Sequence, residues 1–431
     1  MITDKHLRAY MHDFIANICT NIGPRRPASK EENAACDVIK KECESFSDET
    51  IDDPFTTAYN AYPGGLVRVG AVLITIGFAL EWTILYVVAI PIIIIALVEF
   101  IEELMVMDEF IDRFYKKGTS RNVFGKIKPA SGEAKKIIIV GGHTDSAYEI
   151  PFVLKYGAKI GTLALLAVGF GIFVLGMTIV KLVLDLNPAT TWFVSSWKFL
   201  GIARAGWFDL LVYIPAIVWF PYLLWVVKNY ASRKVKVLGA NDNLSGVAVS
   251  LALGKHLQKH RPKNVEVWCG SFGCEEAGQR GSKRFVEKYK DILSNSYTVV
   301  TESLGGMALV TVSAEKMYLI RKGLSLKPIY HDKELVGKFL HAVDSYHSEK
   351  HDMPFHMAYE ATFAGTDATR FSQKGFKALA LSSGGADNMF ITHWHDRSDT
   401  PENVDKFTMW HAVNIIATFI DEVDQELESA D

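Results

Sequence analysis

Histidine and carboxylate side chains follow several apolar segments of the chain, at the points where each segment would end as a strand. The segment 135–141 (KKIIIVG) runs into a His-Thr-Asp triplet that begins at His143, and Val265–Phe272 (VEVWCGSF) runs into Gly273–Gly278 (GCEEAG). Imidazole nitrogens and carboxylate oxygens are ligands that zinc takes in catalytic sites. A lone His-x-Asp is most often structural, so this motif by itself predicts little.

The adjacent acids Glu275 and Glu276 are the most specific single signal. Two neighbouring carboxylates at a strand end repel each other unless a cation lies beside them. A metal centre supplies such a cation, with Glu276 as a ligand and Glu275 left free to accept a proton from the attacking water. The alternative is a solvated pair of surface acids, which is the more common case for two adjacent glutamates.

Three further segments offer ligands of the same kinds. The loop Gly239–Gly246 (GANDNLSG) carries Asp242, which is either a carboxylate bridging two metals or an ordinary turn or N-cap residue. Glu302 ends a third apolar segment, and His395 lies late in the chain. With Asp242 shared, each of two zinc ions would have three protein ligands and an open position. The candidate ligands are His143, Asp242, Glu276, Glu302 and His395.

The order of these motifs resembles peptidase family M28, which contains zinc aminopeptidases and carboxypeptidases. The motifs HTD, GANDNLSG, CEEAGQRGS, TES and HDRSDTPENVD follow one another in the family's order, and NIGPRR at Asn21–Arg26 resembles its N-terminal region. The resemblance covers nearly all of the globular part of the chain and skips two long apolar stretches. It is carried by five ordered motifs, which together are far more specific than any one of them.

The resemblance implies a role for each candidate ligand. His143 and Glu302 would hold one zinc ion. Glu276 and His395 would hold the other, and Asp242 would bridge the two. Position 302 is Glu where the family also often has Asp, and the longer side chain bears on the second zinc site or on contact with the substrate's amino terminus.

The resemblance also assigns residues beside the metals. It implies that Glu275 is the general base and that Asp145 orients the first ligand histidine. His395 is preferred to His393 because Asp399 occupies the place of an acidic residue that the family has four positions after the ligand. Asp367 lies in a segment that resembles one near the family's site, but it has no assigned role. Three histidines are candidates for the pocket lining, also without an assigned role, and they are His347, His351 and His356.

The implied function is hydrolysis of peptide bonds by an aminopeptidase with a dinuclear zinc site. Two alternatives stay open. The resemblance includes glutaminyl cyclases, which share the fold, use one zinc ion and transfer an acyl group. A non-catalytic membrane protein that keeps the fold as a binding module is the other alternative. Zinc stoichiometry separates the three, and neither the side-chain preference nor the end of the peptide attacked follows from the sequence.

Alternating strand and helix patterns are expected to position these residues. They predict an α/β fold, a three-layer sandwich with a mostly parallel mixed central sheet, as in zinc peptidases. Functional loops gather at the carboxyl ends of the strands in such sheets. The expected strands are 135–141, 265–272, 297–301 and 376–381, and the expected helices are 245–260, 282–293, 333–345 and 416–427 with an amphipathic helix ending near Phe46.

Four apolar segments predict about four transmembrane helices, since each is long and almost free of charge. They form two expected hairpins, 66–100 and 158–228, and buried helices of a soluble domain are the alternative. The catalytic domain would then consist of 1–60, 105–156 and 229–431. The four segments are Leu66–Leu80, Trp82–Val98, Ile160–Val180 and Leu210–Val227.

The basic residues that flank these segments predict the orientation of the chain in a membrane. Ten lie on the catalytic side, against three on the other, which favours a catalytic domain in the cytoplasm, close to the bilayer surface. The first ten are Arg68, Arg113, Lys116, Lys117, Lys155, Lys159, Lys228, Arg233, Lys234 and Lys236, and the other three are Lys181, Lys198 and Arg204.

Composition limits the remaining possibilities. Hydrophobic residues make up 49% of the 431 residues, and the net charge is −3 without a basic run, so a nucleic-acid partner is not expected. The five cysteines fit neither a disulfide framework nor a CxxC site, which favours reduced thiols in a reducing compartment. The first residues lack the apolar core of a signal peptide. The expected partners are a peptide substrate and a lipid bilayer, and the oligomeric state stays open.

Overall fold

The computed structural model divides the chain into two compact units. The sheet unit consists of Met1–Tyr59, Lys116–Glu149 and Arg233–Asp431, and the helical unit consists of Asn60–Tyr115 and Ile150–Ser232. Both units are therefore assembled from separate stretches of sequence. The structure describes residues 5–151, 160–197, 204–229, 236–323, 325–349, 353, 356–385 and 391–430.

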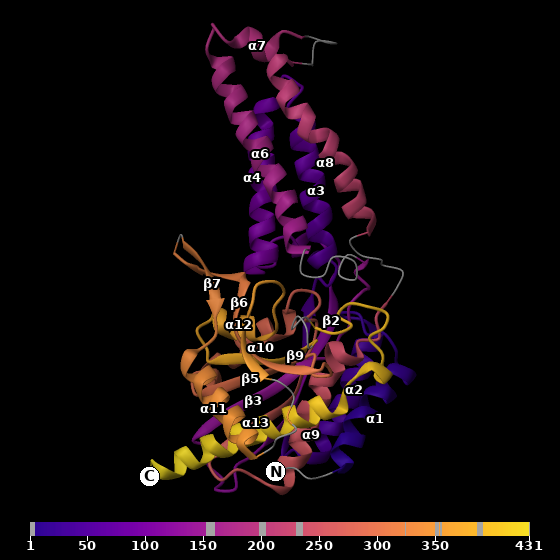
Figure 1. Cartoon of the computed structure of the whole chain (residues 1–431), viewed down its shortest axis with the longest axis vertical. Helices are drawn as coiled ribbons and strands as arrows, with labels where there is room; N and C mark the ends of the chain where they lie inside the picture. Colours follow the sequence, from indigo (N-terminus) through magenta and orange to yellow (C-terminus); the bar gives the residue numbers. More distant parts are fainter. Residues whose placement is uncertain are drawn as a thin grey trace. The chain divides into compact units, whose positions relative to one another are not determined.

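The sheet unit is built on a nine-stranded mixed sheet with the order β1-β2-β4-β3-β5-β9-β6-β7, in which β8 pairs with β6 (Figure 1). β3 is parallel to both β4 and β5, and β5 is parallel to β9. The strands are β1 Glu49–Thr57, β2 Gly118–Ile127, β3 Lys136–His143, β4 Val265–Phe272, β5 Ser296–Glu302, β6 Ala308–Lys322, β7 Ser325–Tyr330, β8 His356–Ala361 and β9 Ala378–Gly384.

All four expected strands are present, as β3, β4, β5 and β9, but the sheet is less parallel than expected. The strands outside the centre, β1 with β2, β2 with β4, β6 with β7 and β6 with β9, pair antiparallel. These flanking strands were missed because β1 and β7 are rich in polar residues, whereas the central strands are continuous apolar runs. The sheet is therefore mixed, with its parallel part centred on β3.

Helices cover both faces of the sheet. Along β3, Ile138 and Val140 belong to one buried core and Ile139 to the other, as the two-residue period of a strand requires. Side chains of α1, α2, α9, α11 and α13 fill the first core, and side chains of α10 and α12 fill the second. These helices are α1 Lys5–Asn21, α2 Lys30–Phe46, α9 Gly246–Lys259, α10 Arg280–Leu293, α11 Lys333–Glu349, α12 Ala368–Gln373 and α13 Lys406–Ser429.

The helical unit contains α3, α4, α6 and α8, which run side by side (Figure 1), and the short helix α7. Three helical segments are long and apolar enough to cross a membrane by length and composition, and they are Ala61–Leu80, Val168–Leu186 and Trp207–Trp225. The helices are α3 Leu66–Leu80, α4 Ala89–Phe100, α6 Ile160–Leu186, α7 Thr191–Ser195 and α8 Leu210–Asn229.

The fourth expected span, Trp82–Val98, is not confirmed as a helix of that length. Residues 82–85 form turns, and α4 begins only at Ala89. The helix continues as Ile101–Val106, where Glu102 and Glu103 follow Glu99 and end the uncharged stretch. Hydropathy recorded an apolar run of sufficient length, but it did not detect the turn that shortens the helix.

Apolar side chains are exposed along the helical unit, while an inner set packs together. The inner core includes Ile74 and Phe78 of α3, Ile93 of α4 and Val174 of α6. Such an outward-facing apolar surface is what a bundle in contact with hydrocarbon would present. The exposed side chains include Val72, Ile76, Ile94, Ile95, Ile172, Ile179, Ile214, Ile217 and Val218.

Candidate metal centre

The candidate ligands meet at the carboxyl edge of the parallel strands. His143 is the last residue of β3, and Glu302 is the last residue of the neighbouring strand β5. Glu276 follows the end of β4 by four residues, and Asp242 lies in the segment just before α9. The chain's β-branched runs therefore end where the polar residues begin, and the sheet brings them to one edge.

His143 and His395 face opposite oxygens of the same carboxylate. His143 Nε2 lies 3.1 Å from Asp242 Oδ1 and 3.7 Å from Glu302 Oε1. His395 Nε2 lies 3.4 Å from Asp242 Oδ2 and 3.2 Å from Glu276 Oε2. The five candidate ligands thus form two groups that share Asp242.

Polar atoms at the centre of this cluster lack partners. Among the described residues, no hydrogen-bond donor reaches the buried atoms Asp242 Oδ2 and Glu276 Oε1. One ligand atom from each of His143, Asp242 and Glu276 lies within 4.8 Å of the other two. Leaving buried carboxylate oxygens unpaired is costly, and a divalent cation held by nitrogen and oxygen ligands removes that cost. The residues present therefore fit a metal.

Charge interactions inside the cluster shift its protonation. Burial favours neutral imidazoles, but Glu276 and Asp242 outweigh it and raise the pKa of His395 to about 10. Burial likewise opposes charging of His143, and nearby carboxylates, Glu302 foremost, still raise its pKa well above 6.5. Burial would raise the pKa of Asp242, yet its interactions with the two histidines hold it below 3.8. A metal ligand must give up its proton, so binding of a cation to these histidines would release protons.

Glu275 lies beside the cluster rather than in it. Its Oε2 is 4.0 Å from His143 Nε2, and its side chain is largely buried. Burial raises the pKa of this carboxyl well above 4.5, and the neighbouring carboxylates of Asp367 and Glu276 add to the increase, while His143 opposes it. The group is placed to exchange a proton at the edge of a metal site.

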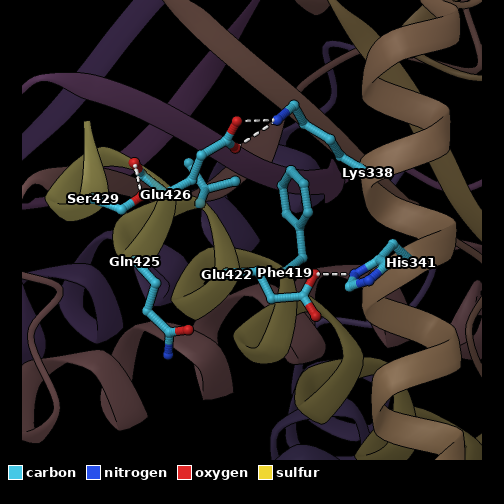
Figure 2. Close-up of a pocket in the computed structure, with 8 residues that line it drawn as sticks. Lys338, His341, Phe419, Glu422, Gln425, Glu426 and Ser429 are labelled. Carbon is cyan, nitrogen blue, oxygen red and sulfur yellow. Dashed lines mark hydrogen bonds and ion pairs between the residues drawn. The ribbon is translucent and has the colours of Figure 1, made fainter.

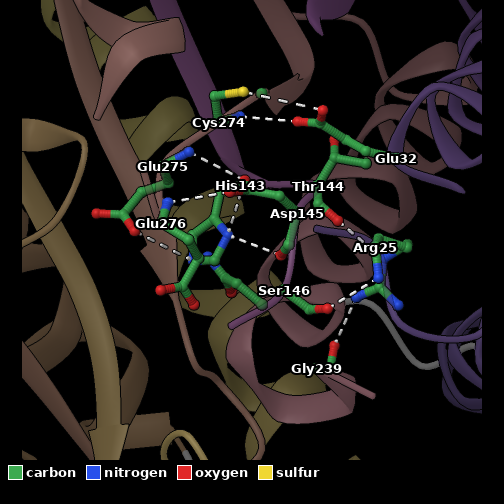
Figure 3. A network of polar contacts seen from close by, with 12 residues as sticks. Arg25, Glu32, His143, Thr144, Asp145, Ser146, Gly239, Cys274, Glu275 and Glu276 are labelled. Atoms are coloured by element: carbon green, nitrogen blue, oxygen red, sulfur yellow. Dashed lines mark hydrogen bonds and ion pairs between the residues drawn. The ribbon is translucent and has the colours of Figure 1, made fainter. Parts of the chain in front are cut away.

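Asp145 holds the loop that carries both glutamates (Figure 3). Its Oδ1 accepts a hydrogen bond from the backbone N–H of Glu275, and its Oδ2 accepts one from that of Glu276, each at 3.0 Å. His143 Nδ1 lies 3.1 Å from the backbone carbonyl of Asp145 and 3.5 Å from its carboxylate. Asp145 therefore contacts His143 mainly through its backbone, and its carboxylate orders the next loop.

The loop with the second histidine is tied to the Asp242 segment. The carboxylate of Asp399 accepts the backbone N–H groups of Asn241 (2.6 Å) and Asp242 (3.1 Å). Burial raises the pKa of this carboxyl to about 7. His393 instead lies against the hydroxyl of Ser398, at 2.8 Å. The structure thus brings His395, and not His393, to the cluster.

Asn243 is a site residue that the sequence analysis missed. Its side-chain amide donates to the carbonyl of Thr301 (2.9 Å) and to Glu302 Oε2 (3.1 Å). Its Oδ1 accepts from the backbone N–H of Ser303 at 2.9 Å. The residue directly after Asp242 therefore orients Glu302, and the only signal for it was its place in the same glycine-flanked loop.

The residues without an assigned role are distributed differently. Asp367 is fully buried, and its Oδ1 accepts from the Ser282 hydroxyl at 2.5 Å. His347 is exposed on α11, and His356 Nε2 lies 2.9 Å from Thr311 Oγ1 on the neighbouring strand. His351 lies outside the described residues. Of those that the structure describes, Asp367 is the one that acts on the cluster, since its charge raises the pKa of Glu275.

A separate surface pocket lies between α11 and α13 (Figure 2). Two pairs border it, Lys338 with Glu426 at 2.7 Å and His341 with Glu422 at 3.1 Å. Its lining contains none of the candidate ligands. The charged groups and the histidine that line it are paired with one another, and the candidate ligands lie instead at the sheet edge.

Residues 227–420 match the model of peptidase family M28, and the chain carries a domain of that family in this region. No curated protein matches the sequence. The match includes Asp242, Glu276, Glu302 and His395, and His143 precedes it.

Solved structures with a similar fold include zinc aminopeptidases and glutaminyl cyclases. A zinc aminopeptidase from Bacillus subtilis is 12% identical with a TM-score of 0.53, and the alignment covers 96% of this chain and 95% of that one. An aminopeptidase from Aneurinibacillus sp. strain AM-1 is 13% identical with a TM-score of 0.52, over 96% and 93%. A glutaminyl cyclase from Bacteroides thetaiotaomicron is 14% identical with a TM-score of 0.52, over 96% and 97%. At these identities the likeness concerns the fold.

Proposed function

Because the chain carries a domain of peptidase family M28, we propose that it is a zinc-dependent exopeptidase, an aminopeptidase with two zinc ions. One observation carries this proposal. The two oxygens of Asp242 face two different histidines, at 3.1 Å and 3.4 Å, as a carboxylate bridging two metals would. The fold of the aminopeptidases from Bacillus subtilis and Aneurinibacillus supports the same class.

The candidate ligands divide between the two metals. His143 and Glu302 would hold one zinc ion, Glu276 and His395 the other, and Asp242 both. When bound, zinc polarises the scissile carbonyl, acidifies water and stabilises the negative charge of the transition state.

The protein's own groups supply the proton transfers and the geometry. Glu275 takes a proton from the attacking water and passes it to the nitrogen of the leaving amine, so its carboxyl acts as base and then as acid. Asp145 holds Glu275 and Glu276 in register through its two backbone hydrogen bonds of 3.0 Å. The largely buried position of Glu275 limits competing exchange with bulk water.

The variant Glu275→Gln tests the proposal. We expect turnover of a peptide substrate to fall by about 10²–10⁴-fold while zinc content stays unchanged, because the base is lost and the ligands remain. The assay is a panel of N-terminally free and blocked peptides, and Glu287→Gln on the exposed face of α10 is the matched control. Wild-type turnover by the Glu275→Gln protein would refute the assignment.

A second candidate function is a glutaminyl-cyclase-like acyl transfer with one zinc ion. The observation in its favour is that cyclases from Bacteroides thetaiotaomicron and Porphyromonas gingivalis share the fold at TM-scores of 0.52 and 0.51. Elemental analysis separates the candidates: two zinc ions per chain support the peptidase, and one supports the cyclase. A protein without zinc would instead support a non-catalytic binding module.

We further propose that the helical unit spans a lipid bilayer and that the catalytic part faces the cytoplasm. Three helical segments of sufficient length and apolar character support the first statement. The flanking basic residues support the second, although Lys155, Lys159, Lys198, Arg233 and Lys234 lie outside the described residues. Protease added to intact cells tests it, since digestion of the sheet unit from outside would contradict a cytoplasmic location.

A further inference from the structure

The segment from the end of α1 to the first turn of α2 reaches three of the loops that carry the candidate ligands. Two fully buried charged residues, Arg25 and Glu32, make these contacts. We propose that Arg25 and Glu32 are positioning residues of the metal centre, which set the spacing of its ligand loops. This inference rests on the proposed two-metal site and assigns a role to residues that contact neither metal nor substrate.

Arg25 joins the His143 loop to the Asp242 loop (Figure 3). Its Nε donates to the carbonyl of Thr144 at 2.9 Å, next to His143. Its Nη2 donates to the carbonyl of Gly239 at 3.0 Å, three residues before Asp242, and its Nη1 donates to the carbonyl of Leu238 at 2.7 Å. One planar guanidinium therefore fixes the distance between a ligand of one metal and the shared ligand.

The backbone of Arg25 strengthens the same connection through Ser146. The Arg25 N–H donates to Ser146 Oγ at 2.9 Å, and the Ser146 N–H donates to the Arg25 carbonyl at 2.8 Å. The Ser146 hydroxyl then donates to the carbonyl of Val237 at 3.0 Å. Gly239 has a φ of +63°, and a Cβ there would lie 2.6 Å from Ser146 Cβ, so the three segments are in close contact.

Glu32 holds the third loop, which leads to Glu275 and Glu276. Its Oε1 accepts from the backbone N–H of Cys274 and from the Ser120 hydroxyl, both at 2.8 Å. Its Oε2 accepts from the backbone N–H of Ala28 at 2.6 Å. The carboxylate of Glu32, which is only seven residues after Arg25, thus connects the loop after β4 to the start of α2.

The two residues act on the metal site only through other residues. Arg25 sets the loops of His143 and Asp242, and Glu32 sets the residue before Glu275. Partners that orient metal ligands in this way typically change metal affinity by about 10–100-fold when they are replaced. A lysine cannot replace Arg25, because an ammonium on a flexible stem does not match the fork of donors that spans these carbonyls.

The test compares each residue with its sequence neighbour in the full-length protein. Arg25→Lys is paired with Arg26→Lys, and Glu32→Gln is paired with Glu31→Gln. Arg26 donates instead to the Tyr148 hydroxyl at 2.7 Å, and Glu31 is partly exposed. We expect at least about tenfold weaker zinc binding in Arg25→Lys and Glu32→Gln, and wild-type binding in the two neighbours.

Cobalt(II) substitution separates positioning from general stabilisation. With Co²⁺ in place of Zn²⁺, the visible spectrum reports ligand geometry, and we expect it to change in Arg25→Lys and Glu32→Gln at equal folded fraction. Wild-type zinc affinity and an unchanged cobalt spectrum in both variants would overturn the proposal. A wild-type protein that binds no zinc would instead contradict the proposed function and this inference with it.

If Arg25→Lys and Glu32→Gln fail to fold, the variant Ser146→Ala tests the positioning role instead. It removes only the hydroxyl between Arg25 N and the Val237 carbonyl. Weaker zinc binding at unchanged thermal stability supports the positioning role, and wild-type zinc binding overturns it.

Discussion

Buried charged side chains are balanced differently at the edge of the sheet and around Lys181 in the helical unit. At the sheet edge, three carboxylates, Asp242, Glu276 and Glu302, face two imidazoles, and buried oxygens of Asp242 and Glu276 find no donor among the described residues. In the helical unit, the fully buried side chains of Lys181 and Asp209 pair directly at 2.7 Å. Lys181 Nζ also donates to the carbonyl of Arg204 at 3.1 Å.

This difference distinguishes a site that needs a ligand from one that does not. A buried charge is tolerated when a partner and hydrogen bonds compensate it, as Asp209 and backbone carbonyls do for Lys181. The sheet edge carries three carboxylates against two imidazoles, and a bound cation, as proposed above, would balance the difference. The comparison predicts that loss of the metal changes only the sheet unit. Breaking the Lys181–Asp209 ion pair is expected to destabilise only the helical unit.

Removing the shared ligand is expected to have the largest effect. In Asp242→Ala both of the proposed zinc ions would lose a ligand, and we expect zinc content to fall below one ion per chain. The loss of several kcal/mol of transition-state stabilisation would lower kcat/KM by about 1,000-fold or more. Elemental analysis and peptide kinetics measure this, with Asp344→Asn on the exposed side of α11 as control. If Asp242→Ala retained two zinc ions, Asp242 would not be the shared ligand and the charge balance described for the sheet edge would be contradicted.

Breaking the buried pair of the helical unit is expected to have the next largest effect. Lys181→Met leaves Asp209 charged and buried, which costs about 3–5 kcal/mol of unfolding free energy. Adding Asp209→Asn removes that charge and keeps an acceptor for the Gly206 N–H, so we expect the double variant to recover part of the loss. Denaturation in detergent measures the stability of both variants. If Lys181→Met lost as much zinc as Asp242→Ala, the separation of the two units would be contradicted.

The smallest effect concerns acid sensitivity of the sheet unit. Burial lowers the pKa of His356 from 6.5 to about 4. Because this folded-state pKa is depressed, the neutral imidazole contributes stability above pH 6.5, and that contribution is lost as the pH falls toward 4. Allowing for its partial exposure, we expect about 1–2 kcal/mol. In His356→Gln, we expect thermal stability to fall less between pH 7 and pH 5 than in the wild type. An unchanged pH profile of thermal unfolding would contradict this role of His356.

The residues at the centre of the candidate site could be predicted from the sequence, because residue types that bind metals and the ends of strands are both local features. The runs before His143, Gly273 and Glu302 are apolar and β-branched, and all three became central strands. The last helix was expected from Ile416, but it begins at Lys406, where Asp405 caps it by accepting the N–H groups of Phe407 and Thr408. The expected pattern had recorded only the apolar part of that helix.

The supporting residues were not predictable, because their partners are backbone groups far away in the sequence. Arg25 contacts Thr144 and Gly239 across 119 and 214 residues, and Glu32 contacts Cys274 across 242. A carbonyl or an N–H is present at every position, so no residue type in the sequence indicates which one an arginine or a glutamate will bind. Distant backbone contacts of this kind emerge only from the folded chain.

The interleaving of the two units in the sequence has a consequence for how the protein is made. The last stretch of the helical unit ends at Ser232, whereas the sheet unit also requires Arg233–Asp431. During synthesis, which proceeds from the N-terminus at roughly 5–20 residues per second, the whole helical unit leaves the ribosome before β4, β5 and β9 exist. β1 and β2 can pair with each other at this stage, but β3, which ends in His143, must wait for its partners β4 and β5 until after Ser232 has been translated.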